Sequence, residues 1–111
     1  MNQEGGDTVS QAKKICIKMY VVGNEIMVAA CDAELVGKTL KDGDMNFKVS
    51  KDFYYDIQGD MKMLEEHLQK ATIANLVGER CVKCGVEMGL IMEENILIID
   101  GVPHAQFALM I

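Results

Sequence analysis

The sequence predicts a two-layer α+β domain: an N-terminal β-hairpin and C-terminal strands form a mainly antiparallel sheet, on which two helices pack. Three observations support this fold class. Strand-like, helix-like and again strand-like apolar segments follow one another along the chain. A Gly-Asn turn joins the first two segments. The length of 111 residues, with 50% hydrophobic and 25% charged residues, suits a single globular domain. We expect a flexible tail at 1–14 and one domain at 15–111.

The first predicted element is a β-hairpin over 15–32, because ICIKMYVV and EIMVAACD flank the turn residues Gly23 and Asn24. Glycine at the first turn position suits a type II′ turn, which pairs Val22 with Glu25. One face of the resulting ladder is wholly apolar, so we expect it to be buried. That face carries Ile17, Met19, Val21, Ile26, Val28 and Ala30.

The same register places Cys16 opposite Cys31 on the second face, as a hydrogen-bonded pair whose spacing alone would permit a disulfide. The N-terminal segment has no apolar leader, and no apolar run is long enough to cross a membrane. We therefore expect a cytoplasmic, reducing location and free thiols. The apolar edge of the hairpin also allows a homodimer.

The middle of the chain contains a predicted strand at 45–49 and a predicted helix that starts at Met61. Asp60 is placed to cap this helix, and apolar residues recur along it at helical spacing. The apolar run at 71–77 fits either a continuation of the helix or a buried strand, and its periodicity does not separate the two.

The last third of the chain begins with a second predicted helix at 79–88, which ends at Gly89. The run at 96–99 predicts a strand, and the segment 100–103 predicts a turn into a final strand that starts at His104. The order of elements completes the α+β pattern.

Five segments carry a family resemblance: ACDAELVGKTL (30–40), VSKDFYYD (49–56), ATIANLVGER (71–80), MGLIMEEN (88–95) and GVPHAQF (101–107). Together they resemble the small archaeal proteins catalogued as domain of unknown function 424. The resemblance covers most of the chain and implies an archaeal cytosolic protein, but it implies no activity. The tail at 1–14 and the cysteines at 81 and 84 depart from the family pattern.

The most specific local motif is Cys-x-x-Cys-Gly, formed by Cys81, Cys84 and the glycine that follows. This spacing is typical of a zinc knuckle, which needs four ligands. Cys16 and Cys31 would complete a four-thiolate site if the helix packed on their face of the hairpin. In the alternative, which we favour, Cys81 and Cys84 are small buried residues one helical turn apart, and the protein holds no metal or cofactor.

The segment 101–106, GVPHAQ, is the best candidate for a functional site, because a rigid turn presents His104 and Gln106 at the start of a strand. These two side chains could equally satisfy backbone groups near the turn. Asn75 must find hydrogen bonds within an apolar run, as a structural anchor or as part of the site. Cys31 and Asp32 leave the hairpin where polar loops gather and complete the candidate ligand-binding set.

Two further interpretations of this set remain open at the sequence level. Asp32 can cap a short turn that Gly37 ends, which is a purely structural role. A nucleophile–base pair of Cys31 and His104 is conceivable, although no third group is available to orient it. The catalytic residues of any enzyme activity are therefore unknown.

The charge balance restricts the classes of partner. Eleven basic against 17 acidic residues give a net charge of −6, which argues against an extended basic groove for nucleic acid. The one stretch that combines basic with aromatic residues contains Lys48, Lys51 and the aromatic run 53–55. The sequence has no phosphate-binding glycine loop, zinc-protease motif or serine-hydrolase motif.

These observations leave three hypotheses. The first is a non-catalytic binding or accessory factor, associated with RNA, a ribosome or a protein partner. The second is a small enzyme or ligand-binding domain with a polar site around 101–106. The third is a domain stabilised by a metal on the four cysteines. We rank them in this order, which favours a protein that is not an enzyme.

Overall fold

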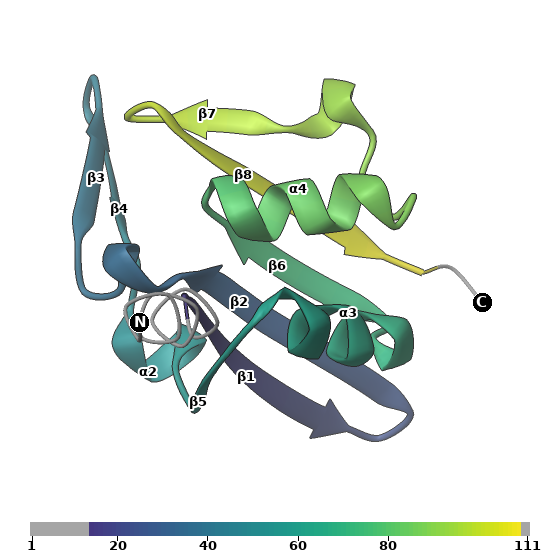
Figure 1. The fold of residues 1–111 in the computed structure, drawn as a ribbon. Helices are drawn as coiled ribbons and strands as arrows, with labels where there is room; N and C mark the ends of the chain where they lie inside the picture. The colour runs from purple at the N-terminus through teal and green to yellow at the C-terminus, as the bar shows by residue number, and fades with distance from the viewer. Residues whose placement is uncertain (1–13, 110–111) are drawn as a thin grey trace, which may run out of the picture.

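The computed structural model describes residues 14–109 and consists of a sheet covered on both faces (Figure 1). The tail expected at 1–14 therefore lies, except for Lys14, outside the described residues. Within these residues the chain forms eight strands: β1 (Ile15–Val22), β2 (Glu25–Asp32), β3 (Thr39–Asp42), β4 (Met45–Lys48), β5 (Ile57–Gly59), β6 (Ile73–Val77), β7 (Leu97–Ile99) and β8 (Val102–Ala108). The helices are α2 (Lys51–Tyr54), α3 (Met61–Lys70) and α4 (Glu79–Glu87), with 3₁₀ turns at Ala33–Leu35 and Glu93–Asn95.

Six strands form the main sheet in the order β5-β1-β2-β6-β8-β7, in which β2 and β6 are the parallel pair and all other neighbours are antiparallel. Helices α3 and α4 lie on one face, and the β3–β4 hairpin with α2 lies against the other (Figure 1). This confirms the predicted α+β class. No described helix has the length and apolar character needed to cross a membrane.

The predicted hairpin register is confirmed along its whole length, from Val22 opposite Glu25 to Cys16 opposite Cys31. Gly23 has a φ of 60°, as the first position of a type II′ turn requires. The expected burial of the apolar face is only partly correct. Ile17 is fully buried, but Val21 is 65% exposed, because the helices cover only the part of the hairpin remote from its turn.

The ambiguous run at 71–77 forms strand β6, which lies between β2 and β8 at the centre of the sheet. Its strand character comes from these two neighbours, which are more than 25 residues away in sequence on either side. The predicted strand at 45–49 is β4, and its partner β3 was not predicted. Helix α3 begins as predicted, with the Asp60 carboxylate accepting the Met63 N–H at 2.9 Å.

The sheet separates two hydrophobic cores because successive side chains along a strand point to opposite faces. The helix-side core includes Ile17, Leu64, Leu76, Cys81 and Cys84. The second core lies under the β3–β4 hairpin and α2, and it includes Cys16, Cys31, Val49, Tyr54 and Val77. The hairpin 15–32 thus lies within the sheet. Its β2 edge pairs with β6, and its β1 edge pairs with β5 at the first three residues.

Candidate functional site

Three of the five predicted site residues come together on the sheet face that the helices do not cover. Asn75 on β6 lies directly opposite Gln106 on β8, and Val77 lies opposite His104. Since residues two apart in a strand share a face, Asn75, His104 and Gln106 all project to the side of the second core. The polar residues that interrupt two apolar strands are therefore neighbours.

These three side chains line a cavity of about 260 Å³ between the sheet and the β3–β4 hairpin. Phe47 of β4 and Tyr54 of α2 provide aromatic walls, and Asn95 and Leu97 close the side next to β7. No Asp, Glu, Lys, Arg or Cys is among the lining residues, all of which belong to the described part of the chain. The cavity is thus polar and uncharged.

His104 is the most constrained polar residue of the cavity. Its side chain is only 9% exposed, and its Nε2 atom is buried without a hydrogen-bond partner among the described residues. The ring packs edge-on against Phe47, with the centroids 4.6 Å apart. Burial lowers the pKa of His104 below its usual value, so the imidazole is neutral at pH 7 and offers one donor and one acceptor.

Asn75 and Gln106 add carboxamide groups beside the imidazole. Asn75 is half-buried, and its Nδ2 atom contacts Met27 Sδ at 3.6 Å, which is a weak partner for an amide. Gln106 is exposed. Burial raises the pKa of Tyr54 to about 12, so its hydroxyl stays protonated at neutral pH. Every polar group of the cavity therefore acts as a neutral hydrogen-bonding group.

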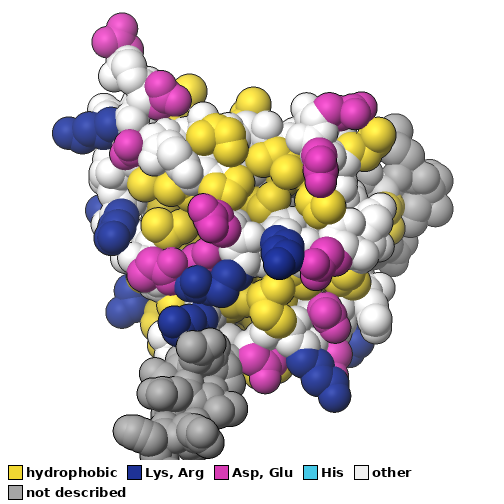
Figure 2. Space-filling model, turned by 45° about the horizontal axis from the view of Figure 1, so that its top comes forward, with side chains coloured by type: hydrophobic (Ala, Val, Ile, Leu, Met, Phe, Trp, Pro, Cys, Tyr) yellow, Lys and Arg dark blue, Asp and Glu magenta, His cyan; other side chains and the backbone are white. Residues whose placement is uncertain are grey.

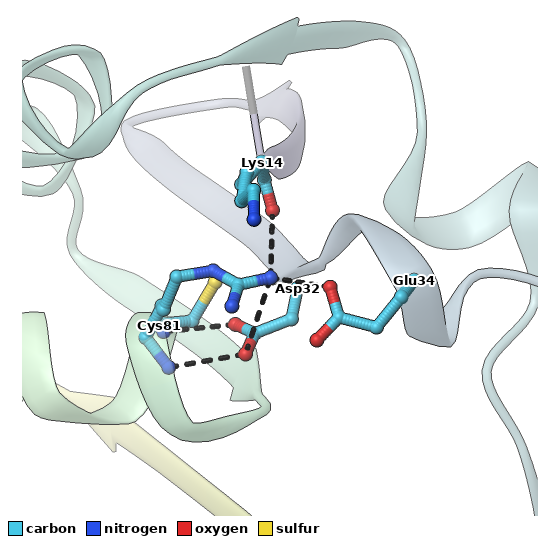
Figure 3. Close-up of polar contacts among 5 residues, drawn as sticks. Lys14, Asp32, Glu34 and Cys81 are labelled. Carbon is cyan, nitrogen blue, oxygen red and sulfur yellow. Dashed lines mark hydrogen bonds and ion pairs between the residues drawn. The ribbon is translucent and has the colours of Figure 1, made fainter. Parts of the chain in front are cut away.

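Asp32 does not line this cavity, so the structure does not bring it together with Asn75, His104 and Gln106. It follows Cys31, so its side chain points to the helix side, where its two carboxylate oxygens accept the backbone N–H groups of Arg80 and Cys81 at 3.1 Å each (Figure 3). It is 2% exposed. Asp32 is thus the capping group of α4, contributed by a residue almost 50 positions earlier, and not the side-chain cap of the turn that follows it.

A small polar cluster surrounds this cap. Arg80 lies 3.9 Å from the Asp32 carboxylate, forms an ion pair with Glu34 and donates to the Lys14 carbonyl at 3.4 Å (Figure 3). Burial raises the pKa of Asp32, and the two amide N–H groups and the Arg80 guanidinium oppose this rise. The cluster fixes the start of α4 against the end of β2.

Cys31 lies in the second core and is fully buried, outside the cavity lining. In the sheet it pairs with Val77, which in turn pairs with His104. Two interstrand steps separate the cysteine from the histidine, or about 10 Å. Burial also raises the pKa of the Cys31 thiol. The nucleophile–base pair of Cys31 and His104 is therefore wrong.

The four cysteines do not form a common site. Cys16 and Cys31 are in the second core, whereas Cys81 and Cys84 on α4 are in the helix-side core, across the sheet. Among the described residues, no group of three or more His, Cys, Asp or Glu side chains is arranged to hold a metal ion. The four-thiolate hypothesis fails because α4 packs on the face opposite to the cysteine pair of the hairpin.

The aromatic cluster predicted at 53–55 divides between core and surface. Tyr54 is buried, whereas Phe53 stacks on Tyr20 with centroids 5.5 Å apart. Lys18 lies 5.2 Å above the Tyr20 ring. Sequence reasoning did not identify Phe47 or Asn95 as lining residues. Neither residue stands in a recognisable motif, and only the long-range packing of β4 and of the 93–95 turn brings them to the cavity.

Fold and site together define a small α+β protein with a neutral polar cavity on the sheet face opposite the helices. The model of a family described as "protein of unknown function (DUF424)" matches residues 20–110, and the chain belongs to this family. The chain is also similar to the crystal structure of an uncharacterized conserved protein from Methanopyrus kandleri. The TM-score is 0.70 and the identity 26%, covering 84% of this chain and 89% of the other. No curated protein matches the sequence.

Proposed function

We propose that this protein is a non-catalytic binding factor whose cavity receives a neutral, planar group with adjacent hydrogen-bond donors and acceptors. One observation carries the proposal. Asn75, His104 and Gln106 converge on a cavity with aromatic walls, and the His104 Nε2 atom is buried there without a partner in the described chain. A buried polar atom without a hydrogen bond costs free energy, which a ligand close to the imidazole would recover.

The ligand class follows from the lining. A phosphate or carboxylate would find no cation in the cavity, and a metal ion would find no anionic ligand. Carboxamides and a neutral imidazole instead match the edge of a nucleobase, where N–H and C=O groups alternate. Phe47 and Tyr54 supply faces or edges against which a flat ring can pack. A volume of about 260 Å³ suits one such ring system and is below the usual range for drug-sized ligands.

The proposal favours a single base over an extended nucleic-acid surface. The net charge of −6 opposes contacts with many phosphates, whereas one inserted base needs few. The cavity has no thiol to act as a nucleophile and no carboxylate to orient the His104 imidazole, which supports binding without catalysis. The four free cysteines of the described chain are in keeping with a cytoplasmic location.

The direct test is a titration of the ¹⁵N-labelled protein with adenosine, guanosine, cytidine and uridine, followed by NMR. We expect at least one nucleoside to shift the amide resonances of β6 and β8 in a saturable manner. Gln106→Ala should weaken that binding about fivefold, because it removes one hydrogen bond. Gln58→Ala changes another exposed glutamine, on β5 and remote from the cavity, and should leave binding unchanged.

Two outcomes would overturn the proposal. One is the absence of a saturable shift with all four nucleosides. The other is equal binding by the wild type and the Gln106→Ala variant. If nicotinamide or propionamide binds and none of the four nucleosides does, the ligand of the cavity is a carboxamide, such as that of a side chain. This result would exclude a nucleobase as the ligand. Co-sedimentation with ribosomes over a range of salt concentrations then separates a base within RNA from a free nucleoside.

A further inference from the structure

Strand β7 forms one end of the main sheet and carries unusually exposed apolar side chains. Leu97 is 65% exposed and Ile98 is 58% exposed. Figure 1 shows β7 beside β8 with no described strand beyond it. The three-residue length of β7 is one of the devices that protect a free edge, but the strand, with the sequence LII, contains none of the others that act within a strand, such as lysine, proline or a bulge. An edge of this kind is suited to pairing with another strand.

The hairpin geometry determines which backbone groups of β7 are free. Asp100 and Gly101 have φ values of 55° and 77°, as in a type I′ turn, so Ile99 and Val102 close the hairpin as a hydrogen-bonded pair. The next pair, Ile98 and Pro103, is then of the non-hydrogen-bonded type. Consistently, the Pro103 carbonyl points the other way and accepts the Gly78 N–H at 2.9 Å. The N–H and C=O of Ile98 therefore point outward, away from the sheet.

We propose that two copies of the chain associate through β7, antiparallel and edge to edge, about a two-fold axis at Ile98. On the axis, each Ile98 N–H donates to the Ile98 carbonyl of the other copy, which satisfies the four outward groups with two hydrogen bonds. Strand β7 is complementary to β7 of a second copy. When the two strands pair in this register, apolar side chains lie opposite apolar side chains on both faces of the extended sheet.

The helix-side face of the edge supports the same partner. Ile98 borders a groove of about 470 Å³ whose apolar part is formed by α4 and the start of β8. Figure 2 shows hydrophobic side chains gathered on this face of the molecule, with acidic and basic side chains around them. The rim of the groove carries Glu79, Glu93 and Lys83, so it has both signs of charge. A rim of mixed sign can complement a rotated copy of itself, whereas a highly charged partner would require one sign.

The opposite face links the contact to the cavity. Leu97 lines the cavity and projects to the same side as Ile99. In the proposed register, Leu97 of one copy lies opposite Ile99 of the other. The second copy would thus extend the apolar wall of the cavity next to β7. The contact itself rests on the free edge and the groove and does not require a ligand in the cavity.

The experiment measures the molar mass of the full chain by sedimentation equilibrium from micromolar to hundreds of micromolar concentrations. We expect the wild type to approach the mass of two chains, and to do so more readily at higher salt, because each copy carries a net charge of −6. Ile98→Lys and Ile98→Glu each place like charges on the axis and should weaken association at least about tenfold. Val22→Lys alters an equally apolar, 73% exposed residue at the far end of the sheet and should have no effect.

The mixing experiment is specific for the two-fold axis. An equimolar mixture of the Ile98→Lys and Ile98→Glu variants should regain the mass of a dimer, because opposite charges then meet at one position. Circular dichroism and thermal unfolding establish that each variant is folded. A wild type that stays monomeric throughout, an Ile98→Lys variant that associates like the wild type, or a mixture that stays monomeric would each overturn the proposal. None of these results would affect nucleoside binding by a single chain, so the two proposals fail independently.

Discussion

Replacing Asp32 by alanine should destabilise the fold more than any other single change in the polar cluster at the start of α4. The Asp32 carboxylate accepts two backbone N–H groups of the first turn of α4, each at 3.1 Å, and it is 2% exposed. Without this side chain the two N–H groups lose their acceptors in a place where water has little access. The substitution therefore removes both hydrogen bonds and leaves one buried and one partly buried donor without its acceptor.

The magnitude can be estimated from these contacts. A hydrogen bond to a charged group contributes about 1.5–3 kcal/mol, and the loss of a helix cap costs about 0.5–2 kcal/mol. Allowing for partial relaxation of α4, we expect Asp32→Ala to lower the free energy of unfolding by about 2–4 kcal/mol. Asp32→Asn retains one acceptor and should cost about 1–2 kcal/mol. Arg80→Met removes the 3.9 Å ion pair with Asp32, the ion pair with Glu34 and the hydrogen bond to the Lys14 carbonyl. Because the Arg80 side chain is 34% exposed, we expect a cost of about 1 kcal/mol or less.

The assay is equilibrium unfolding in urea, followed by circular dichroism, with the m-values compared between variants. Glu34→Ala is the control, since Glu34 touches the cluster only through Arg80 from an exposed position. If Arg80→Met proves as costly as Asp32→Ala, the ion pair and not the helix cap fixes α4. An Asp32→Asn variant as stable as the wild type would show that the cost of burying the charge cancels the benefit of the two hydrogen bonds.

Three further predictions follow from burial and backbone geometry. Because burial lowers the His104 pKa, the unfolded chain binds the proton more tightly, so stability should fall as the pH drops below about 6.5 and through the folded-state pKa. When the free energy of unfolding is measured as a function of pH, the His67→Gln control should show this loss of stability at low pH, and the His104→Gln variant should not. Gly78→Ala should be strongly destabilising, by about 3 kcal/mol or more in urea unfolding, because φ is +107° and a Cβ would lie 2.4 Å from the Asp32 Cγ. Gly89→Ala is the control, because Gly89 has a φ of +77° and open space around it, so that only the backbone strain of a left-handed alanine is added. It should cost only about 1 kcal/mol. If both variants lose the same stability, the predicted clash with Asp32 is wrong. Finally, the four buried thiols should resist a disulfide reagent in the native protein and react fully in denaturant, and rapid native labelling would contradict their burial.

Local signals in the sequence predicted the elements whose structure depends on near neighbours. The register of the 15–32 hairpin follows from one turn and the two-residue period of strands, and both are local. The start of α3 follows from Asp60, which directly precedes the helix and accepts the Met63 N–H three residues later. In both cases the residues that decide the structure lie within one window of sequence.

The features that were missed depend on contacts between distant segments. The run at 71–77 becomes a strand because β2 and β8 flank it, and its apolar pattern alone did not distinguish strand from helix. Asp32 had a plausible local role, but its acceptor capacity is used by α4, 48 residues later. Asn75 was recognised as a polar residue within an apolar run, and Gln106 as a polar residue that follows a rigid turn. Their position opposite each other required the β6–β8 register, which could not be derived before β6 was assigned.

The two faces of the sheet explain why the cavity forms where it does. The central parallel pair, β2 and β6, is covered on the helix side by α3 and α4, and polar side chains there serve the fold, as Asp32 does. Among the described residues, the other face is covered mainly by the four-residue strands of the β3–β4 hairpin and by the four-residue helix α2, which are too short to cover a six-stranded sheet. Beyond them β6 and β8 meet solvent, and polar residues are expected at that boundary.

Exposure to solvent explains why Gln106 is polar, but it does not explain why a polar residue occupies the buried position of His104. That imidazole is 9% exposed and has a nitrogen without a partner among the described residues, whereas a leucine would fill the same space at no such cost. The buried His104 nitrogen is therefore the observation that supports the proposed ligand on this part of the sheet.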